Sequence, residues 1–501
     1  MSTLDPQLHA GAVRSRRRRR LAVRMLAGCL IVIAAVAATV ATGTLLEVKF
    51  FTDALKQNPR LNVGNELATA DAGGPQTLLL IGSDKRAKGA IDASSPPHSD
   101  TMLLVRLDPS QPDTTMLSIP RDLKVRIRPD KGPASTQKIN AAYSIGGAKL
   151  AVKTVKRELG VKINHVIDIN FGGFKALVDY LGCVFVQVDR RYYHSNLGLA
   201  PSDTYSEIDI QPGYQKLCGQ DALSYVRYRH TDDDLVRAAR QQDFLRQIKN
   251  QVGASGLIAR RHAIERIFGK YASTDIRSAD DVLKLVELVV QSAGHPVRQV
   301  TFAASIGPSY VTANRAQVRR TVHLFLHGGA APARVKANPT SSAHSASKHG
   351  ARRGRPAPKP NSNLVPATAD ELAQAHVTAP KLPFRLYYPV NRVAGPGSSA
   401  DIVRDYRLEH HPAYVVVVSQ GGLGQFYNLE GTTWQGAPIL RNPNQTVTLA
   451  GRRMQLYYEG QRLRVVAWHD GNAVYWLTNT LQNVLTNRQM LAIAAAARPT
   501  T

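Results

Sequence analysis

The sequence has few acidic residues, few cysteines and no convincing internal repeat. It contains 37 Asp and Glu against 64 Lys and Arg, and only three cysteines in 501 residues. No Cys or His residues follow a metal-ligand spacing, so a zinc site is not predicted. With 43% apolar and 20% charged residues, the composition is neither collagen-like nor that of a wholly disordered chain. Because the length exceeds one ordinary domain, two globular units with connecting segments are expected.

The formal net charge of +27 is concentrated in two segments. Residues 1–24 carry seven arginines against one acid, and residues 331–363 carry seven Lys and Arg with no acid. The remaining excess is spread over more than 400 residues, which is unlike a dense polyanion-binding surface. We therefore predict no nucleic-acid partner.

An uncharged stretch of 22 residues, MLAGCLIVIAAVAATVATGTLL, occupies positions 25–46 behind the basic tail 1–24. A helix needs about 20 residues to cross the bilayer core. Because positive charge stays on the cytoplasmic side, the pattern predicts a single-pass cell-membrane protein with a cytoplasmic N-terminus and extracellular C-terminal domains. A cleaved signal peptide is the alternative, although the apolar stretch exceeds its usual length.

The cysteines fit this topology. Cys29 lies in the predicted span, so Cys183 and Cys218 are the only two cysteines of the exported region. An even pair in an oxidising compartment predicts one disulfide. A pair of buried free thiols remains the alternative.

After a membrane-proximal stem at 47–74, residues 75–327 alternate short apolar runs with helical patterns. Such alternation predicts an α/β fold with helices layered on a sheet. Strands are expected at 77–81, 101–107, 114–119, 165–170, 184–188 and 298–303. Helices are expected at 140–159, 171–181, 232–253, 279–293 and 313–326.

Residues 328–380 are rich in Pro, Ala, Ser and cations and predict a disordered linker that lets the next domain reach away from the first. Residues 381–501 show short alternating runs and a final helical pattern at 487–497. They predict a small α+β accessory domain, mostly antiparallel sheet with a terminal helix, that binds the wall or a partner. Its aromatic residues form either the sheet core or a sugar-stacking surface; they are Tyr387, Tyr388, Tyr457, Tyr458, Trp468 and Trp476.

Two acids follow or begin neighbouring strands of the first domain. Asp84 comes directly after the run at 77–81, and Asp100 opens the next run. Two carboxylates at neighbouring strand ends are a common way to hold Mg²⁺ against a substrate phosphate. Taken singly, each of these acids is more often a turn or cap residue.

Cations and acids alternate in a second group. Arg121 follows a strand that ends at a proline, and an extended segment would place Arg227 and Arg229 on one face. On the following helix, one stripe would present Asp234, Arg237 and Gln241. Arginine suits bidentate capture of phosphate oxygens, and the interleaved acids favour a compact metal-bound pyrophosphate over a continuous polyanion. A solvated ion-pair network is the alternative.

Five motifs, in the order GSDKR, HSDTMLLVRL, SIPRD, KINAAYSIGG and PGYQKLCGQDALSYVRYRHTDDDLVRAARQQDFLRQ, resemble the LytR-CpsA-Psr family of bacterial cell-envelope proteins. The resemblance covers about residues 77–251. It implies an α/β/α catalytic domain with a hydrophobic cavity for a polyprenyl chain. It further implies a phosphotransferase that moves a glycopolymer from a polyprenyl-pyrophosphate carrier onto peptidoglycan at the membrane. A pyrophosphatase and a non-catalytic polymer-binding or regulatory protein are the alternatives.

Carried over residue by residue, the resemblance assigns Mg²⁺ or Mn²⁺ binding to Asp84 and Asp100. The catalytic residues would be Arg121, Arg227, Arg229, Asp234, Arg237 and Gln241. Substrate contacts are expected from Arg86, His98 and Arg240. His98 departs from the arginine that many members carry there, and a histidine is only partly charged at neutral pH.

Overall fold

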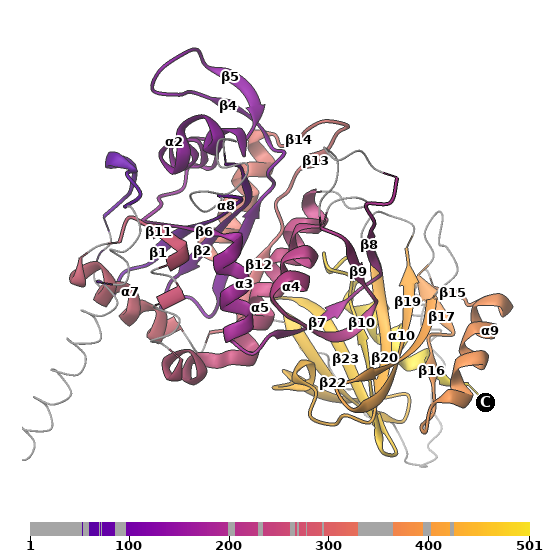
Figure 1. Cartoon of the computed structure of the whole chain (residues 1–501). Helices are drawn as coiled ribbons and strands as arrows, with labels where there is room; N and C mark the ends of the chain where they lie inside the picture. The colour runs from indigo at the N-terminus through magenta and orange to yellow at the C-terminus, as the bar shows by residue number, and fades with distance from the viewer. Residues whose placement is uncertain are drawn as a thin grey trace, which may run out of the picture.

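The computed structural model describes residues 53, 60–69, 71, 73–85, 97–198, 206–228, 234–260, 266–267, 270–276, 278–292, 295–328, 364–393, 402–420 and 425–500 (Figure 1). The predicted basic tail and transmembrane segment, with Cys29, lie outside these residues. Within the described ranges, no helix is long and apolar enough to cross a membrane.

A mixed six-stranded sheet forms the centre of the first domain, in the order β11-β6-β1-β2-β3-β12. β2 runs antiparallel between β1 and β3, whereas β6 is parallel to β1 and β12 is parallel to β3. The strands are β1 (Gln76–Ser83), β2 (Ser99–Leu107), β3 (Thr114–Ile119), β6 (His165–Asn170), β11 (Ala272–Thr274) and β12 (Val297–Val300).

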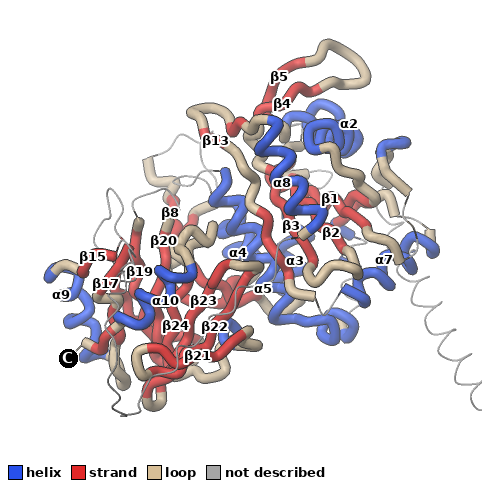
Figure 2. The backbone as a smooth tube through the Cα atoms, turned by 180° about the vertical axis from the view of Figure 1, so that it is seen from behind, coloured by secondary structure: helices blue, strands red, loops and turns tan. Residues whose placement is uncertain are grey.

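Both faces of this sheet are covered by helices because its strands are apolar on both sides. In β1, Leu79 and Ile81 pack under α2 (Ala141–Leu159) and α8 (Arg315–His327). Leu78 and Leu80 point to the opposite face and pack under α7 (Ala279–Ser292) and α5 (Asp234–Ala259). Figure 2 shows α8 across the near face of the sheet. The predicted α/β/α layering of this domain is therefore confirmed.

The stem prediction needs a correction at its C-terminal end. Val63 is 4% exposed and belongs to the main core of the first domain. The backbone N–H of Leu61 donates to the carbonyl of Thr274 in β11. Residues 60–69 therefore pack on the first domain, because the apolar residues Leu61, Val63 and Leu67 of this segment contact its main core.

Several short elements build a second core beside the sheet, next to α5. β7 pairs with β10, β8 pairs with β9, and α3 lies against α4. Their bounds are α3 (Phe171–Tyr180), β7 (Val184–Val188), β8 (Tyr192–His194), β9 (Ile208–Ile210), β10 (Gly213–Leu217) and α4 (Gly219–Arg227). The predicted Cys183–Cys218 disulfide is present and ties the turn after α3 to the start of α4. A hairpin of β4 (Lys124–Ile127) and β5 (Ser135–Lys138) projects at the top of Figure 1.

The C-terminal domain is a seven-stranded antiparallel sheet with the terminal helix α10 (Asn487–Ala496), as predicted. The strand order is β18-β19-β20-β24-β23-β22-β21. Their bounds are β18 (Ile402–Leu408), β19 (His411–Ser419), β20 (Phe426–Thr432), β21 (Gln445–Leu449), β22 (Arg452–Glu459), β23 (Arg462–Asp470) and β24 (Ala473–Thr478). Tyr388 and Trp468 are fully buried in the core of this sheet, which confirms the core interpretation for them. Trp476 is also fully buried, but it packs in the cluster that includes Tyr214 of the first domain.

The linker boundary at 380 is wrong. The domain already includes β15 (Leu364–Pro366), which pairs with β17 (Asn391–Val393), and α9 (Ala369–Thr378). Ala375 of α9 is fully buried in the core of the sheet. The Pro- and Ala-rich composition concealed a short capped helix, whose Thr368 and Glu371 form a capping box.

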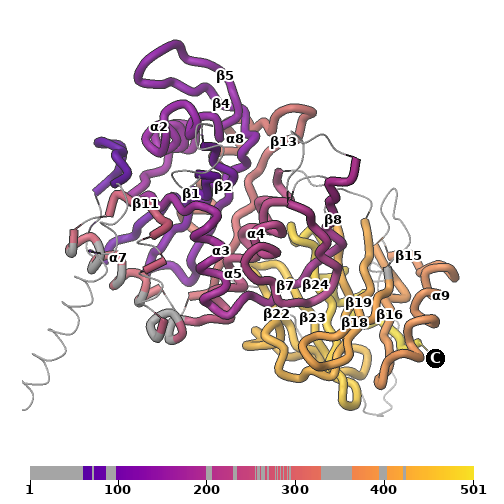
Figure 3. The backbone as a smooth tube through the Cα atoms, viewed as in Figure 1, coloured from indigo at the N-terminus to yellow at the C-terminus, as the bar shows by residue number. Residues whose placement is uncertain are grey.

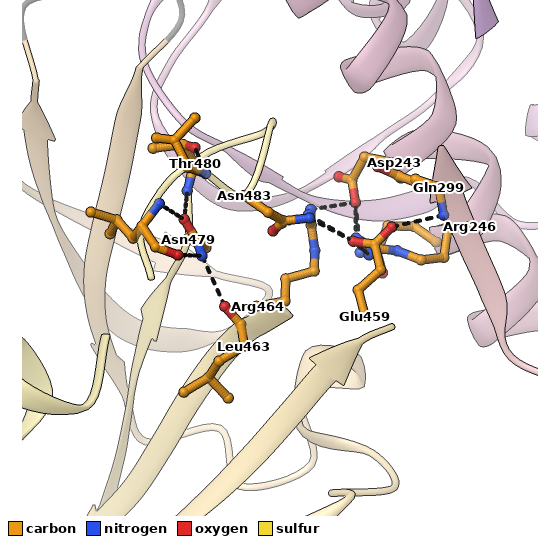
Figure 4. A network of polar contacts seen from close by, with 12 residues as sticks. Asp243, Arg246, Gln299, Glu459, Leu463, Arg464, Asn479, Thr480 and Asn483 are labelled. Carbon is orange, nitrogen blue, oxygen red and sulfur yellow. Dashed lines mark hydrogen bonds and ion pairs between the residues drawn. The ribbon is translucent and has the colours of Figure 1, made fainter. Parts of the chain in front are cut away.

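The two domains are docked rather than separated, contrary to the expectation that the linker lets the second reach away. Figure 3 shows the C-terminal strands beside α4, α5 and β7. The rings of Phe185 and Trp434 lie 5.2 Å apart, and Trp476 donates to the Gln187 side chain at 3.1 Å. A buried ion-pair network also crosses the interface, shown in Figure 4. No local pattern in the sequence predicts these contacts, because their partners lie more than 200 residues apart.

Candidate active site

A cavity of about 470 Å³ lies where the ends of β2 and β3 meet α4, β9 and the start of α5. Five of the predicted site residues line it. They are Asp100, Arg121, Arg227, Arg237 and Gln241. Other lining residues include Ser206, Ile208, Gln220, Leu223 and Ser224, which the sequence did not indicate.

An ion-paired cluster forms one wall of this cavity. Asp100 Oδ1 accepts a hydrogen bond from Arg121 Nη1 at 2.6 Å, and Asp100 Oδ2 lies 2.9 Å from Arg227 Nη2. The register explains the first contact. Met102 pairs with Ile119 in the antiparallel β2–β3 ladder, so Asp100 and Arg121 are opposite each other just beyond it. The side chains of Asp100 and Arg121 are 15% and 18% exposed, whereas Arg227 is 40% exposed.

The position of Arg227 corrects one prediction. Arg227 is the last residue of α4 and not part of an extended segment. All five residues at positions 222–226 are buried, so no alternation of buried and exposed positions marks this short helix in the sequence. The Arg227 guanidinium lies 3.9 Å from the centre of the Phe171 ring, so the helix end and α3 together aim this arginine at Asp100.

Buried polar residues at the start of α5 hold the residues of this ion-paired cluster in place. Arg237 pairs with Asp234 one turn earlier on α5, and both side chains are almost fully buried. The backbone N–H of Asp122 donates to Asp234 Oδ2 at 3.2 Å, which ties α5 to the loop that carries Arg121. Gln241 donates to Thr101 Oγ1 at 2.9 Å and to the Val226 carbonyl at 3.1 Å. Gln241 therefore joins β2 to the end of α4.

Lys138 is a further cation that the sequence reasoning did not assign. It lies at the end of β5, and its Nζ is 3.1 Å from Asp122 Oδ1. Its signal was available in the KINAAYSIGG motif, which supplied the resemblance but no site residue.

Asp84 and His98 lie together beside the cluster. The backbone N–H of His98 donates to Asp84 Oδ1 at 2.5 Å, and the Asp84 N–H donates to the His98 carbonyl at 3.1 Å. The His98 imidazole is 54% exposed, with its Nδ1 3.8 Å from Asp84 Oδ2. Asp84 is 31% exposed and does not line the cavity.

The two acids offer the chemistry that a hard cation requires. Asp84 and Asp100 both present carboxylate oxygens near the end of the β1–β2 ladder, and Mg²⁺ or Mn²⁺ commonly takes one or two carboxylates with phosphate and water oxygens. The donor set fits, since the hydrogen bond that Asp84 accepts from the described residues comes from a backbone N–H and leaves carboxylate lone pairs for a cation. Within the described ranges, the only group of three or more potential metal-binding side chains contains the Cys183–Cys218 disulfide and is not a metal site.

The remaining predicted contacts have different outcomes. Arg86 and Arg229 lie outside the described residues. Arg240 is fully buried and does not line the cavity. Its guanidinium stacks 4.7 Å from the centre of the Tyr192 ring and donates to the Tyr228 carbonyl at 2.8 Å. Arg240 therefore lies outside this cavity, because aromatic residues of β8 and α4 enclose this side of α5, and its substrate contact stays a prediction.

A model of the LytR_cpsA_psr family matches residues 44–323. The chain is 30% identical over 220 residues to biofilm regulatory protein A of Streptococcus mutans. The aligned region covers 42% of this chain and 53% of that protein. The chain is 31% identical over 228 residues to the polyisoprenyl-teichoic acid–peptidoglycan teichoic acid transferase TagV of Bacillus subtilis, covering 45% and 56%. The chain thus spans about half the length of these two relatives.

The chain matches a larger share of a third relative. The polyisoprenyl-teichoic acid–peptidoglycan teichoic acid transferase TagU of Enterococcus faecalis is 33% identical over 227 residues, covering 45% of this chain and 69% of that protein. Among solved structures, B. subtilis TagV matches at 27% identity with a TM-score of 0.40, covering 51% of this chain and 98% of that one. Since the family match extends over more than half of the 501 residues, the chain belongs to the LytR-CpsA-Psr family.

Proposed function

We propose that this protein is a phosphotransferase that moves an anionic glycopolymer from a polyprenyl-pyrophosphate carrier onto a hydroxyl group of peptidoglycan. The observation that carries the proposal is the cluster in which Arg121 and Arg227 converge on Asp100 at the wall of a cavity. Two relatives named as polyisoprenyl-teichoic acid–peptidoglycan teichoic acid transferases support the same class of reaction.

The arginines are suited to a pyrophosphate. Arg227 is partly exposed and can turn its planar fork from Asp100 to phosphate oxygens, whereas the more buried Arg121 is held by the β2–β3 register. Arg237 lines the same cavity and is fixed by its pair with Asp234. Fixed cations around a phosphate stabilise charge that grows on the leaving group, which is usually the dominant contribution to phosphoryl transfer.

In the proposed reaction, the oxygen of an acceptor hydroxyl attacks the phosphorus that carries the polymer. A new phosphoester bond forms, the bond from this phosphorus to the bridging oxygen breaks, polyprenyl phosphate leaves with the electron pair of that bond, and the hydroxyl proton is released to water. Apolar lining residues on the α4 side, Ile208 and Leu223, suit the first part of the prenyl chain. Gln241 has no charge to offer and acts by positioning, since it holds the end of α4 against β2.

Asp84 and Asp100 would hold Mg²⁺ or Mn²⁺. The cation would supply positive charge beside the pyrophosphate oxygens. In that state, the arginines that pair with Asp100 would have phosphate oxygens as alternative partners.

We further propose that residues 25–46 anchor the protein in the cell membrane as one span. The N-terminus would be cytoplasmic and both folded domains would be extracellular. This arrangement would place the cavity on the side where peptidoglycan is assembled.

The test is product formation by the full chain from a short polyprenyl-pyrophosphate-linked glycan and peptidoglycan fragments, with and without Mg²⁺. Metal-dependent appearance of the glycan on peptidoglycan is expected. Release of free phosphorylated glycan alone would replace the proposal with a pyrophosphatase, in which water takes the place of the acceptor. Unchanged substrate with retained polymer binding would replace it with a non-catalytic binding protein.

A further inference from the structure

A second cavity, of about 500 Å³, lies between the two domains and outside the candidate active site. The first domain contributes residues of β7, α5 and the segment before β12, and the C-terminal domain contributes β22, β23 and the loop before β21. Helix α5 connects both cavities, since Gln241 lines the first and Lys249 lines the second. Eight residues of helix separate these positions by about 12 Å.

One wall of this cavity is formed by an ion-pair network between α5 of the first domain and strands β22 and β23 of the C-terminal domain (Figure 4). Arg246 Nη1 donates to Glu459 Oε2 at 2.6 Å, and Arg464 Nη2 donates to Asp243 Oδ1 at 2.5 Å. The backbone N–H of Gln299 also donates to Glu459 at 3.1 Å. Because the two arginines and two acids neutralise each other, this network fixes the shape of the cavity without giving it a net charge.

Beyond this network, the charged lining residues are two cations, Lys249 and Arg441, and one acid, Asp189. The whole lining includes Arg246, Lys249, Arg441 and Arg464, against the acids Asp189 and Glu459. The Lys249 ammonium donates to the backbone carbonyl of His295, a neutral acceptor. Burial lowers the Lys249 pKa to about 8, so the group is mostly charged at pH 7. Arg441 is exposed and belongs to the C-terminal part of the lining.

Polar atoms without a partner also belong to residues that line this cavity. Among the described residues, neither the Tyr458 hydroxyl nor His295 Nδ1 has a hydrogen-bond partner, although both atoms are buried. Such atoms are costly unless a ligand or water satisfies them. Hydroxyl and imidazole groups can bind sugar hydroxyls, while Lys249 and Arg441 can bind phosphate or carboxylate groups.

We propose that the interdomain cavity is a binding site for an acidic saccharide, specifically for a segment of an anionic glycopolymer at a distance from the reacting phosphate. The identity of the ligand as the transferred polymer rests on the proposed function. Both domains contribute to the site, so the docked C-terminal domain serves to bind polymer. Contacts away from the reacting centre raise the residence time of the polymer without taking part in the chemistry.

The experiment measures binding of lipid-free oligomers to the full chain in low-salt buffer at pH 7. A glycerol phosphate oligomer tests phosphate, an oligogalacturonate tests carboxylate, and a dextran of similar length is the neutral control. The variants are the double change Lys249→Gln with Arg441→Gln, and Tyr458→Phe. Arg453→Gln is the matched control, since Arg453 is an exposed arginine of β22 that does not line the cavity.

One anionic oligomer is expected to bind, and the double variant should bind it about tenfold more weakly or worse because two charge-assisted contacts are lost. Tyr458→Phe should weaken binding without lowering the thermal unfolding midpoint, since the hydroxyl has no partner in the described part of the chain. Arg441→Gln alone should weaken binding in a fully folded protein. Arg453→Gln should bind like the wild type.

Equal binding of dextran, or wild-type affinity in the double variant, would overturn the inference. If the wild type transfers polymer while the double variant binds oligomer normally, this inference fails and the proposed function stands. If binding depends on Lys249 and Arg441 in a chain that transfers nothing, the proposed function fails and the binding site stands.

Discussion

Glu430 of β20 gives a quantitative test of how the domains are joined. It is fully buried, and its carboxylate accepts hydrogen bonds from the Gln187 amide, from the Tyr214 N–H at 3.2 Å and from the Tyr406 hydroxyl at 2.9 Å. Gln187 and Tyr214 belong to the first domain, so this carboxylate lies at the interface. Burial outweighs the hydrogen bonds and raises the pKa of Glu430 to about 7.

The raised pKa fixes both the sign and the size of the expected effect. The ordinary value is 4.5, so between pH 4.5 and 7 the folded protein holds a proton that the unfolded chain releases. The contribution of Glu430 to the free energy of unfolding therefore falls as the pH rises through this window and is constant above it. One pKa unit corresponds to about 1.4 kcal/mol, so the shift of the Glu430 pKa from 4.5 to about 7 changes the free energy of unfolding by about 3 kcal/mol.

The assay is denaturant unfolding of the wild type and Glu430→Gln at several pH values from 4.5 to 8. All three tryptophans lie at or beyond position 434, so their fluorescence reports on the C-terminal domain. The wild type should lose about 3 kcal/mol relative to Glu430→Gln across this range. The exposed Glu409→Gln should follow the wild type. Parallel pH dependence of the wild type and Glu430→Gln would refute the reasoning.

Three further outcomes are expected. Replacing Cys183 and Cys218 with alanine should lower the free energy of unfolding by about 3 to 4 kcal/mol, as chemical denaturation would measure, because their disulfide closes a loop of sequence separation 35. Arg240→Met should lower it by about 2 kcal/mol through a lost hydrogen bond and ring contacts, with little change in oligosaccharide binding. Asp84→Asn should raise the Mg²⁺ concentration needed for half-maximal transfer by about tenfold. The measurement is a Mg²⁺ titration of the transfer rate after a chelator has removed bound metal from the protein.

The sequence predicted the sheet and the first group of site residues well because their signals are local. Apolar runs defined β1, β2 and β3, and the short connection between β2 and β3 left few ways to pair these two strands. Asp100 and Arg121 come from the ends of two such strands, so antiparallel pairing was sufficient to bring them together.

Sequence reasoning is weaker where the deciding contacts are distant. Arg240 is adjacent to the predicted stripe of α5, but Tyr192, from β8, encloses it. The helix α4 was missed because its nine residues contain less than three turns of periodic pattern.

The docking of the C-terminal domain was not predictable in the same way. Glu430 and Gln187 meet across 243 positions, and Arg246 and Glu459 across 213. An acidic residue at an apolar position of a strand looks like an interruption of the hydrophobic pattern, because the sequence does not show which residue it will bind. The flexible composition before Leu364 suggested separation, whereas the interface itself consists of buried polar pairs that no periodicity reveals.

The most direct test of the central claim compares wild type, Arg227→Ala and Arg191→Ala in the transfer assay, with mass spectrometry of the peptidoglycan product. Arg191 is an exposed arginine that pairs with Asp209 outside the cavity, so it is the matched control. The account predicts a phosphate between glycan and peptidoglycan, a rate about 100-fold lower for Arg227→Ala, and an unchanged rate for Arg191→Ala. A product without that phosphate, or a wild-type rate for Arg227→Ala, would contradict it.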